Sequence, residues 1–266
     1  MTEDNNVKET ISNTQELSIG NWSPDEAEAL HSALELPNWA PWLAASVESL
    51  AGRAKNFPAG QMVLKNGPEY VASLSLNQID WNGSTESLPS WDDVAGDPTD
   101  YAQTYVPGGN TLVLLSMNVA PSWKGKHIPG KMITAAQLLA QQLTVDHLIG
   151  SFRPSGFGEL KKAMGYDLDF ETYCHMKRHA AQQPLDPWLG NLWRFGMEMI
   201  VPDPKAMTVA VTEAEFYSYH THYHPGQWQE VTKSIWECGE VGQWAIENGI
   251  AVYRESNMWG RLPIYA

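Results

Sequence analysis

The chain has 266 residues, of which 43% are hydrophobic and 12 are tryptophan, so it is long enough to bury a large core. Its formal net charge of −14 argues against a nucleic acid partner, because an acidic protein repels a polyanion. The two cysteines, Cys174 and Cys238, lie far apart and have no metal-ligand spacing, which is typical of a reduced intracellular protein.

The N-terminal region is acidic and polar and does not resemble a signal peptide. No apolar run approaches the length of about 20 residues that a membrane-spanning helix needs. We therefore expect a cytoplasmic protein with no membrane partner. Residues 1–22 lack apolar periodicity, which predicts a flexible tail, and residues 23–266 are expected to form a single domain with a C-terminal extension, because no repeat or linker divides them.

The first ordered element is a helix that begins at Ser23, which forms a capping box with Glu26. A second helix is predicted over residues 42–55. Two strands are predicted around Asn66-Gly67, a pair typical of tight hairpins. Residues 82–109 are rich in Gly, Pro, Ser and Asp, and an irregular connection of this length often covers a site, so we interpret the segment as a lid that contains a short helix.

The middle of the chain predicts a unit of two parallel strands joined by a helix. Residues 110–119 form a continuous apolar run that is typical of a buried central strand, residues 130–143 form a helix, and residues 145–152 form a second buried strand. Such a unit has a right-handed crossover. Further helices are predicted over residues 157–164, 169–181 and 186–200. The remainder predicts antiparallel strands, so the fold class is α/β.

The loop between the first central strand and its helix has the features of an anion site. Backbone N–H groups and the positive end of a helix dipole meet there, and Lys124, Lys126 and Lys131 add charge to an otherwise acidic chain. The alternative is that Gly125 and Gly130 serve only turn geometry and that the lysines are solvated. Neither of the common glycine-rich nucleotide motifs is present.

The strand, loop and helix resemble the acyl-CoA pyrophosphate site of the GNAT superfamily. Lys124 stands at the basic position of that pattern and Gly125 at its first glycine, whereas His127 and Pro129 replace the next two small residues, and proline has no N–H to donate. Longer blocks resemble the GNAT-like loading and decarboxylase domains of polyketide synthases. These blocks are FPAGQMVL at 57–64, LIGSFRPSGFG at 148–158, DPWLGNLWRFGM at 186–197, and WECGEVGQW and AVYRESNMWGRLP near the C-terminus.

This resemblance implies a GNAT fold, which is a mixed, mostly antiparallel sheet with splayed central parallel strands flanked by helices. It implies a coenzyme A thioester, acetyl- or malonyl-CoA, or a phosphopantetheine arm as ligand, and an acyl carrier protein supplied in trans as partner. The implied activity is decarboxylation of a malonyl thioester, with or without transfer of the acyl group. The resemblance assigns the catalytic imidazole to His175 and a hydroxyl to Ser151 or Ser155, and it places Gly190 where an arginine is usual.

The remaining ligand contacts are expected along the strand and loop. Backbone amides near Met117 and Val119 are candidates to bind the oxygen of an enolate, because the central strands diverge there. The predicted set of cofactor-binding residues is Met117, Val119, Lys124, Gly125, Lys126, His127, Gly130 and Lys131. Trp39 either walls an acyl pocket or packs in the core. Arg153 either clamps a substrate carboxylate or forms an ordinary ion pair.

Several alternatives stay open. Without the resemblance, His175 is a surface histidine on a charged helix. The histidines of YHTHYH, at positions 220, 222 and 224, suit a metal if the segment is a strand, but the preceding TEAEF starts like a helix, on which they spread too widely, so no metal is expected. Two other functions compete with decarboxylation: a conventional acetyl-CoA-dependent N-acetyltransferase, and a noncatalytic module that binds acyl-CoA or a partner protein.

Overall fold

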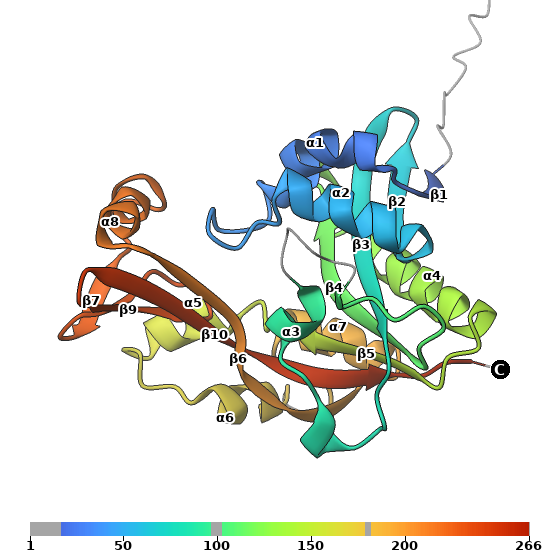
Figure 1. The fold of residues 1–266 in the computed structure, drawn as a ribbon. Coiled ribbons are helices and arrows are strands. Elements are labelled where there is room, and N and C mark those ends of the chain that lie inside the picture. The colour runs from blue at the N-terminus through green and yellow to red at the C-terminus, as the bar shows by residue number, and fades with distance from the viewer. Residues whose placement is uncertain (1–16, 97–102, 179–181, 266) are drawn as a thin grey trace, which may run out of the picture.

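One sheet organises the part of the chain that the computed structural model describes, residues 17–96, 103–178 and 182–265. Within these residues the strands follow the spatial order β1-β2-β3-β4-β5-β10-β9-β8-β7, and β6 pairs with β10 (Figure 1). Their bounds are β1 Leu17–Asn21, β2 Gln61–Asn66, β3 Glu69–Ile79, β4 Thr111–Val119, β5 His147–Phe152, β6 Glu198–Thr212, β7 Gln229–Thr232, β8 Ile235–Glu237, β9 Gln243–Glu247 and β10 Ile250–Leu262.

The pair β4 and β5 is parallel, whereas the other paired strands are antiparallel. The prediction of a mixed, mostly antiparallel sheet with two parallel central strands is thereby confirmed. The hairpin predicted around Asn66-Gly67 is confirmed as β2 and β3. Gly67 has a φ of +58°, a backbone conformation that glycine adopts without steric cost.

The long strand β10 joins two parts of the sheet. One of its edges pairs with β6, and its other edge pairs first with β9 and then with β5. The pairing with β6 shifts register between Glu255 and Asn257, where β6 contributes additional residues around Asp203. In Figure 1, β10 runs from the lobe that holds β7, β9 and α8 to the lobe that holds β3 and β4.

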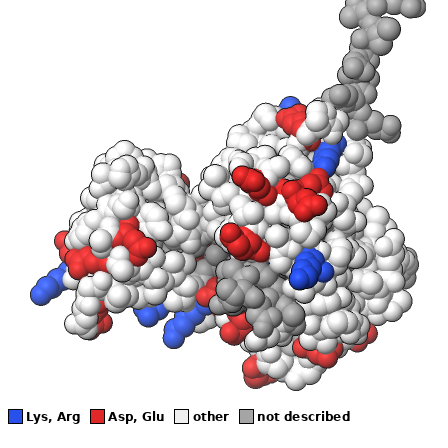
Figure 2. Space-filling view, turned by 45° about the horizontal axis from the view of Figure 1, so that its top comes forward, with Lys and Arg blue, Asp and Glu red and all other residues white. Residues whose placement is uncertain are grey.

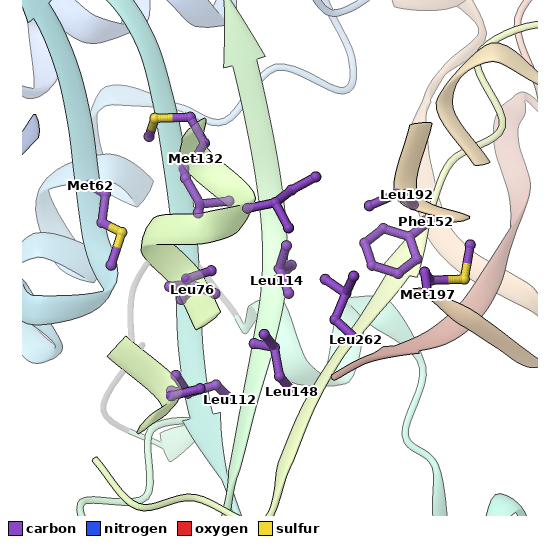
Figure 3. Close-up of a cluster of buried hydrophobic side chains, with 14 of the residues drawn as sticks. Met62, Leu76, Leu112, Leu114, Met132, Leu148, Phe152, Leu192, Met197 and Leu262 are labelled. Carbon is purple, nitrogen blue, oxygen red and sulfur yellow. The ribbon is translucent and has the colours of Figure 1, made fainter. Parts of the chain in front are cut away.

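Helices cover both faces of the sheet. Their bounds are α1 Ala27–Leu30, α2 Val47–Asn56, α3 Trp91–Ala95, α4 Ile128–Gln142, α5 Phe157–Ala163, α6 Phe170–His175, α7 Pro187–Arg194 and α8 Glu213–His222. The helices α4 and α7 pack in one core cluster with Leu112, Leu114 and Phe152 (Figure 3), whereas α3 packs with Val113 and Ile149 in another. Because neighbouring residues of a strand point to opposite faces, α4 and α7 lie on one face and α3 lies on the other.

The N-terminal helix begins as predicted, with a capping box between Ser23 and Glu26. The predicted tail over residues 1–22 is corrected in its last part, because residues 17–21 form β1 at the sheet edge and the side chain of Trp22 is buried. Residues 1–16 lie outside the described residues. The second helix begins at Val47 rather than at residue 42, because the Ser46 hydroxyl caps it by accepting the N–H of Ser49.

The central unit is confirmed, and α4 begins at Ile128, two residues before the predicted start. The helix predicted over residues 186–200 is too long. Gly196 follows α7 with a φ of +80°, and the N–H of Met197 bonds to the carbonyl of Leu192, a glycine stop that ends the helix. The helix predicted over residues 169–181 ends at His175, although residues 179–181 lie outside the described residues.

The short helix expected within residues 82–109 is α3, which has a capping box between Ser90 and Asp93. Residues 97–102, which belong to the predicted lid, lie outside the described residues. No helix among the described residues is long and apolar enough to cross a membrane. Acidic side chains are prominent on the face shown in Figure 2, as the net charge of −14 leads one to expect.

The core prediction concerns Leu112 of β4, which is fully buried between α4 and the sheet. Leu112→Ala removes apolar contacts and leaves a cavity, so we expect the free energy of unfolding to fall by about 2–5 kcal/mol in urea titration. The control is Leu138→Ala on α4, whose side chain is 53% exposed and whose replacement is expected to change stability by about 0.5 kcal/mol or less. Equal losses would contradict this packing.

Candidate functional site

The candidate site begins where two central strands separate. The register pairs Thr111–Leu114 of β4 with His147–Gly150 of β5 and extends no further, although β4 continues to Val119 and β5 to Phe152. Figure 3 shows the two ribbons close together at one end and diverging toward the other. On its other edge β4 carries a bulge, because Leu76 pairs with Leu114 and Ser75 pairs with Ser116, which leaves Leu115 without a register partner.

A cavity of about 670 Å³ lies at this separation. Some of its lining residues come from the loop before α4 and from α7, on one face of the sheet. Others come from α3, on the other face, and from β6, the strand that pairs with β10. The cavity therefore passes through the sheet between β4 and β5. Its principal lining residues are Trp39, Trp91, Leu114, Leu115, Ser116, Met117, Asn118, Val119, Lys124, Gly125, His127, Ser151, Phe152, Arg153, Ser155, Arg178, Trp188, Asn191, Arg194, Met207 and Asn257.

The charges along the cavity differ between the two faces. Lys124 and Arg194 contribute to its lining on the face of α4 and α7. On the face of α3, the lining includes Ser151 and Asn257, and the carboxylate of Asp203 on β6 accepts the hydroxyl of the serine. One end is thus suited to an anionic group, and the other end is lined by hydrogen-bonding groups.

Backbone donors face the opening from β4. The N–H of Ala120 donates to the carbonyl of Val71 on β3, and the direction of these groups alternates along a strand. The N–H groups of Met117 and Val119 therefore point away from β3, to the side that β5 has left. An N–H in this position can donate to a carbonyl oxygen on which negative charge develops.

The loop before α4 contributes some of the predicted residues and not others. Lys124, Gly125 and His127 line the cavity, and His127 takes a left-handed conformation with a φ of +57° immediately before α4. Lys126, Gly130 and Lys131 do not belong to the lining.

Contacts explain two of these exceptions. The ammonium of Lys126 lies 4.5 Å from the centre of the Trp123 ring. A Cβ on Gly130 would approach the ring of Phe195 to 2.7 Å, so this glycine allows α4 and α7 to pack closely. Lys131 is exposed on α4.

A hydrogen-bonded chain that sequence reasoning missed anchors Trp39 at the cavity. The Trp39 Nε1 group donates to Asn118 Oδ1 at 2.7 Å, and Asn118 Nδ2 donates to Glu35 Oε1 at 2.6 Å. Glu35 is 2% exposed, and burial raises its pKa. This chain fixes the indole in the cavity lining, and contact of Trp39 with an acyl group stays a prediction.

A second cluster joins α3, β5 and β6. The Ser151 hydroxyl donates to Asp203 Oδ2 at 3.1 Å, and the same oxygen accepts the backbone N–H of Trp91 at 2.9 Å. Burial raises the pKa of Asp203. Burial, opposed by one hydrogen bond and reinforced by nearby carboxylates, raises the pKa of Asp92 on α3 to about 6. Of this cluster, only Ser151 was predicted from the sequence.

Arg153 forms ion pairs rather than standing free. Its Nε donates to Glu255 at 2.8 Å, and it also pairs with Glu240, while the guanidinium lies over the ring of Trp39. Burial opposes the charge of Arg153, but the surrounding glutamates raise its pKa. The structure therefore has the ordinary ion pair, the second of the two alternatives considered for Arg153, although the residue still lines the cavity.

His175 does not reach the cavity. It is the last residue of α6, its side chain is exposed, and it is not part of the cavity lining, whereas Tyr173 and Cys174 of the same helix turn into the core. The structure thus gives no geometric support to the catalytic role predicted for His175. Ser155 lines the cavity as an exposed residue at its edge, and Ser151 is buried inside it.

Among the residues that the structure describes, no group of three or more His, Cys, Asp or Glu side chains could hold a metal ion. His220 and His222 lie on α8, so the helical alternative for that segment is the observed one.

The fold is similar to that of solved acyltransferase-like domains. The loading GNAT-like domain of CurA from Lyngbya majuscula is 17% identical with a TM-score of 0.60, over 71% of this chain and 88% of that domain. The GphF GNAT-like decarboxylase in complex with isobutyryl-CoA is 23% identical with a TM-score of 0.57, over 71% of this chain and 90% of that protein.

The ribosomal-protein-S18-alanine N-acetyltransferase from Escherichia coli is 11% identical with a TM-score of 0.45, over 94% of this chain and 96% of that enzyme. No protein-family model and no curated protein matches the chain. The similarity to these two solved structures confirms the predicted GNAT fold.

The ion pair of Arg153 generates a stability prediction. Arg153→Met leaves Glu255, whose side chain is 0% exposed, without its cation, so we expect the free energy of unfolding to fall by about 3 kcal/mol in urea titration. The matched control is Lys65→Met, which breaks the more exposed pair of Lys65 with Glu26 and is expected to cost about 1 kcal/mol or less. A loss at Arg153 no larger than that of the control would argue against a structural ion pair.

Proposed function

We propose that the protein binds an acyl thioester of coenzyme A, or of a phosphopantetheine arm, between β4 and β5 and decarboxylates malonyl-type acyl groups. The observation that carries this proposal is the cavity that crosses the sheet where the pairing of β4 and β5 ends at Leu114 and Gly150. Its volume of about 670 Å³ lies within the range of about 300–1,000 Å³ that is usual for small-ligand sites.

The ligand would lie with its phosphates at the cationic end of the cavity. Lys124 and Arg194 contribute to the lining there, and the N-terminus of α4, a helix of 15 residues, adds its dipole. Pro129 has no N–H and lies in the first turn, so side-chain cations replace part of the usual backbone cradle. Acetyl- and malonyl-CoA and a carrier-bound arm share the pantetheine that would fill the opening.

The backbone of β4 would stabilise the charge that decarboxylation creates. When the bond between the carboxylate and Cα breaks, carbon dioxide leaves and the electron pair moves into the thioester, which places negative charge on its carbonyl oxygen. The N–H groups of Met117 and Val119 point into the opening and would donate to that oxygen. Uptake of one proton at Cα then gives the acetyl thioester.

The surroundings of the acyl end favour loss of the carboxylate over tight binding of it. Arg153 is already paired with two glutamates, and Asp203 lies behind the serine that lines the wall. A substrate carboxylate would therefore gain little from ion pairing there, and its departure would relieve repulsion from Asp203. The Ser151 hydroxyl, which lines the cavity and donates to Asp203, would orient the acyl group or relay the proton.

The resemblance of the sequence blocks to GNAT-like loading and decarboxylase domains supports this proposal, as does the similarity in fold to the decarboxylase GphF. Transfer of the resulting acyl group to an acyl carrier protein in trans would be a further step. Gly190 stands in place of the arginine that is usual in this block, which argues for decarboxylation as the main reaction.

A second candidate is acyl transfer from acetyl-CoA to an amine. The observation that favours it is the buried carboxylate of Asp203, whose raised pKa suits acceptance of a proton through Ser151. Acetylation of an amine panel with no turnover of malonyl-CoA would select this candidate. Binding of acyl-CoA with no reaction of either kind would select a noncatalytic module.

The first test of function is incubation with malonyl-CoA, with formation of acetyl-CoA followed by mass spectrometry. We expect turnover by the wild type and a rate about tenfold or more lower for Ser151→Ala, because the hydroxyl faces the acyl end. Because the His175 side chain is exposed outside the lining, His175→Ala is expected to keep the rate. If His175→Ala lost activity and Ser151→Ala kept it, the result would support a catalytic role for the His175 imidazole and contradict the role proposed for Ser151.

The second test concerns the cationic end. Lys124→Glu reverses a charge of the lining, so we expect the Kd for malonyl-CoA, measured by calorimetry, to rise about tenfold at low salt and less at high salt. The matched control is Lys55→Glu on α2, an exposed lysine outside the lining, which is expected to leave the Kd unchanged. An equal effect of the two variants would mean that only net charge matters.

A further inference from the structure

A second cavity adjoins the acyl end of the first. Its volume is about 240 Å³, and its wall comes from the segment between α1 and α2, from α2, from α3 and from β6. The two cavities share Trp39, Trp91, Ser116 and Met207, so these four residues form the partition between them. Among the described residues, none in the loop before α4 or on α7, which carry the cationic end, lines the second cavity.

The partition contains one side chain that a ligand can displace. Trp39 Nε1 donates to Asn118 Oδ1 at 2.7 Å. Trp91 Nε1 donates to the carbonyl of Leu115 at 2.9 Å. These bonds fix the two indoles, whereas Met207 has an unbranched thioether side chain with three rotatable bonds, which adapts to the shape of its neighbours. A chain would therefore pass from the first cavity into the second beside Met207.

The carboxylates of the second cavity are already bonded within the protein. Glu35 accepts the Nδ2 group of Asn118 at 2.6 Å and the backbone N–H of Ala45 at 3.3 Å. The charge of Arg53 opposes the rise in the pKa of Glu35 that burial causes. Asp92 accepts a backbone N–H of β6 at 2.8 Å. A hydrocarbon chain would leave these bonds in place and would contact the apolar part of the wall, which includes Trp42, Leu43, Ala44, Ala95 and Val209.

The proposed position of the thioester directs its acyl group toward the partition. The carbonyl oxygen would accept from the N–H groups of Met117 and Val119, and Ser116, the residue before Met117, lines both cavities. The pantetheine arm would enter from the other end, where Lys124 lies. A substituent on Cα would therefore lie next to the second cavity.

We propose that the second cavity binds the alkyl chain of the acyl group, and that the preferred substrates are malonyl thioesters with an unbranched alkyl chain on Cα. The inference rests on the proposed function, because it assumes that the acyl thioester lies between β4 and β5. Loss of carbon dioxide and uptake of one proton at Cα would convert such a substrate into a saturated, straight-chain acyl thioester. Binding of these products can be measured without turnover.

The test measures the Kd of acetyl-, butyryl-, hexanoyl- and octanoyl-CoA by calorimetry with the full chain. Each CH₂ group that leaves water lowers the Kd by about fourfold when it is fully buried. We expect hexanoyl-CoA to bind the wild type about tenfold or more tightly than acetyl-CoA, because its longer chain enters the second cavity.

A variant that fills the second cavity tests where the chain lies. Ala44 lines the second cavity and not the first, so Ala44→Phe places a ring in the path of the chain. We expect the ratio of the Kd values of acetyl- and hexanoyl-CoA to fall to about threefold or less. The matched control is Ala210→Phe, at an exposed position of β6 outside both linings, which should retain the ratio of the wild type.

The outcomes separate this inference from the function on which it rests. If acetyl-CoA binds and longer chains bind no more tightly, the inference is overturned and the proposed thioester site stands. If none of the four thioesters binds, both fall. If Ala44→Phe retains the ratio, the chain lies elsewhere and the inference is overturned. Should Ala44→Phe fail to fold by circular dichroism, Val209→Trp in the same wall replaces it, and the series with the wild type requires no variant.

Discussion

The structure depends on one interruption of a hydrogen-bond ladder. Parallel strands in the middle of a sheet normally stay paired along their length, because buried N–H and C=O groups are costly to leave without partners. Here the ladder between β4 and β5 stops after Leu114 and Gly150, although both strands continue. The interruption exposes backbone donors in the interior of the fold and opens the cavity that every functional assignment uses.

Side-chain networks hold the two strands in this separated arrangement. On the β4 side, Asn118 is fixed between Trp39 and Glu35. On the β5 side, Arg153 is tied to Glu255 of β10 and to Glu240. Each network requires a buried carboxylate, Glu35 or Glu255, to lose its hydration, which is unfavourable in free energy. In return, each network holds a rigid polar or aromatic group at the cavity edge. The arginine also lies over the Trp39 ring, so the two networks meet across the opening.

Much of the fold was predictable because its signals are local. The capping box of Ser23, the turn at Asn66-Gly67 and the apolar run of β4 each act over a few residues. Among the predicted site residues, Val119 and Lys124, which adjoin those signals, and Ser151, which the resemblance suggested, line the cavity. Glu35, Asp203 and Asn257 are isolated polar residues in separate segments, and no spacing in the sequence joins them. His175 lies outside the cavity lining because the helical phase of α6 turns Tyr173 and Cys174 inward.

The register shift between β6 and β10 has a consequence for how the cavity keeps its shape. Pro202 and Pro204 flank Asp203, and neither can donate a backbone proton to a neighbouring strand, so the regular pleat fails there. A strand that is pinned at such a kink cannot slide by a residue along its partner, and a slide would turn Asn257 to the opposite side of the sheet. The two prolines thus fix the register of β6 and β10 beside the cavity, although the two long strands twist along the rest of their length.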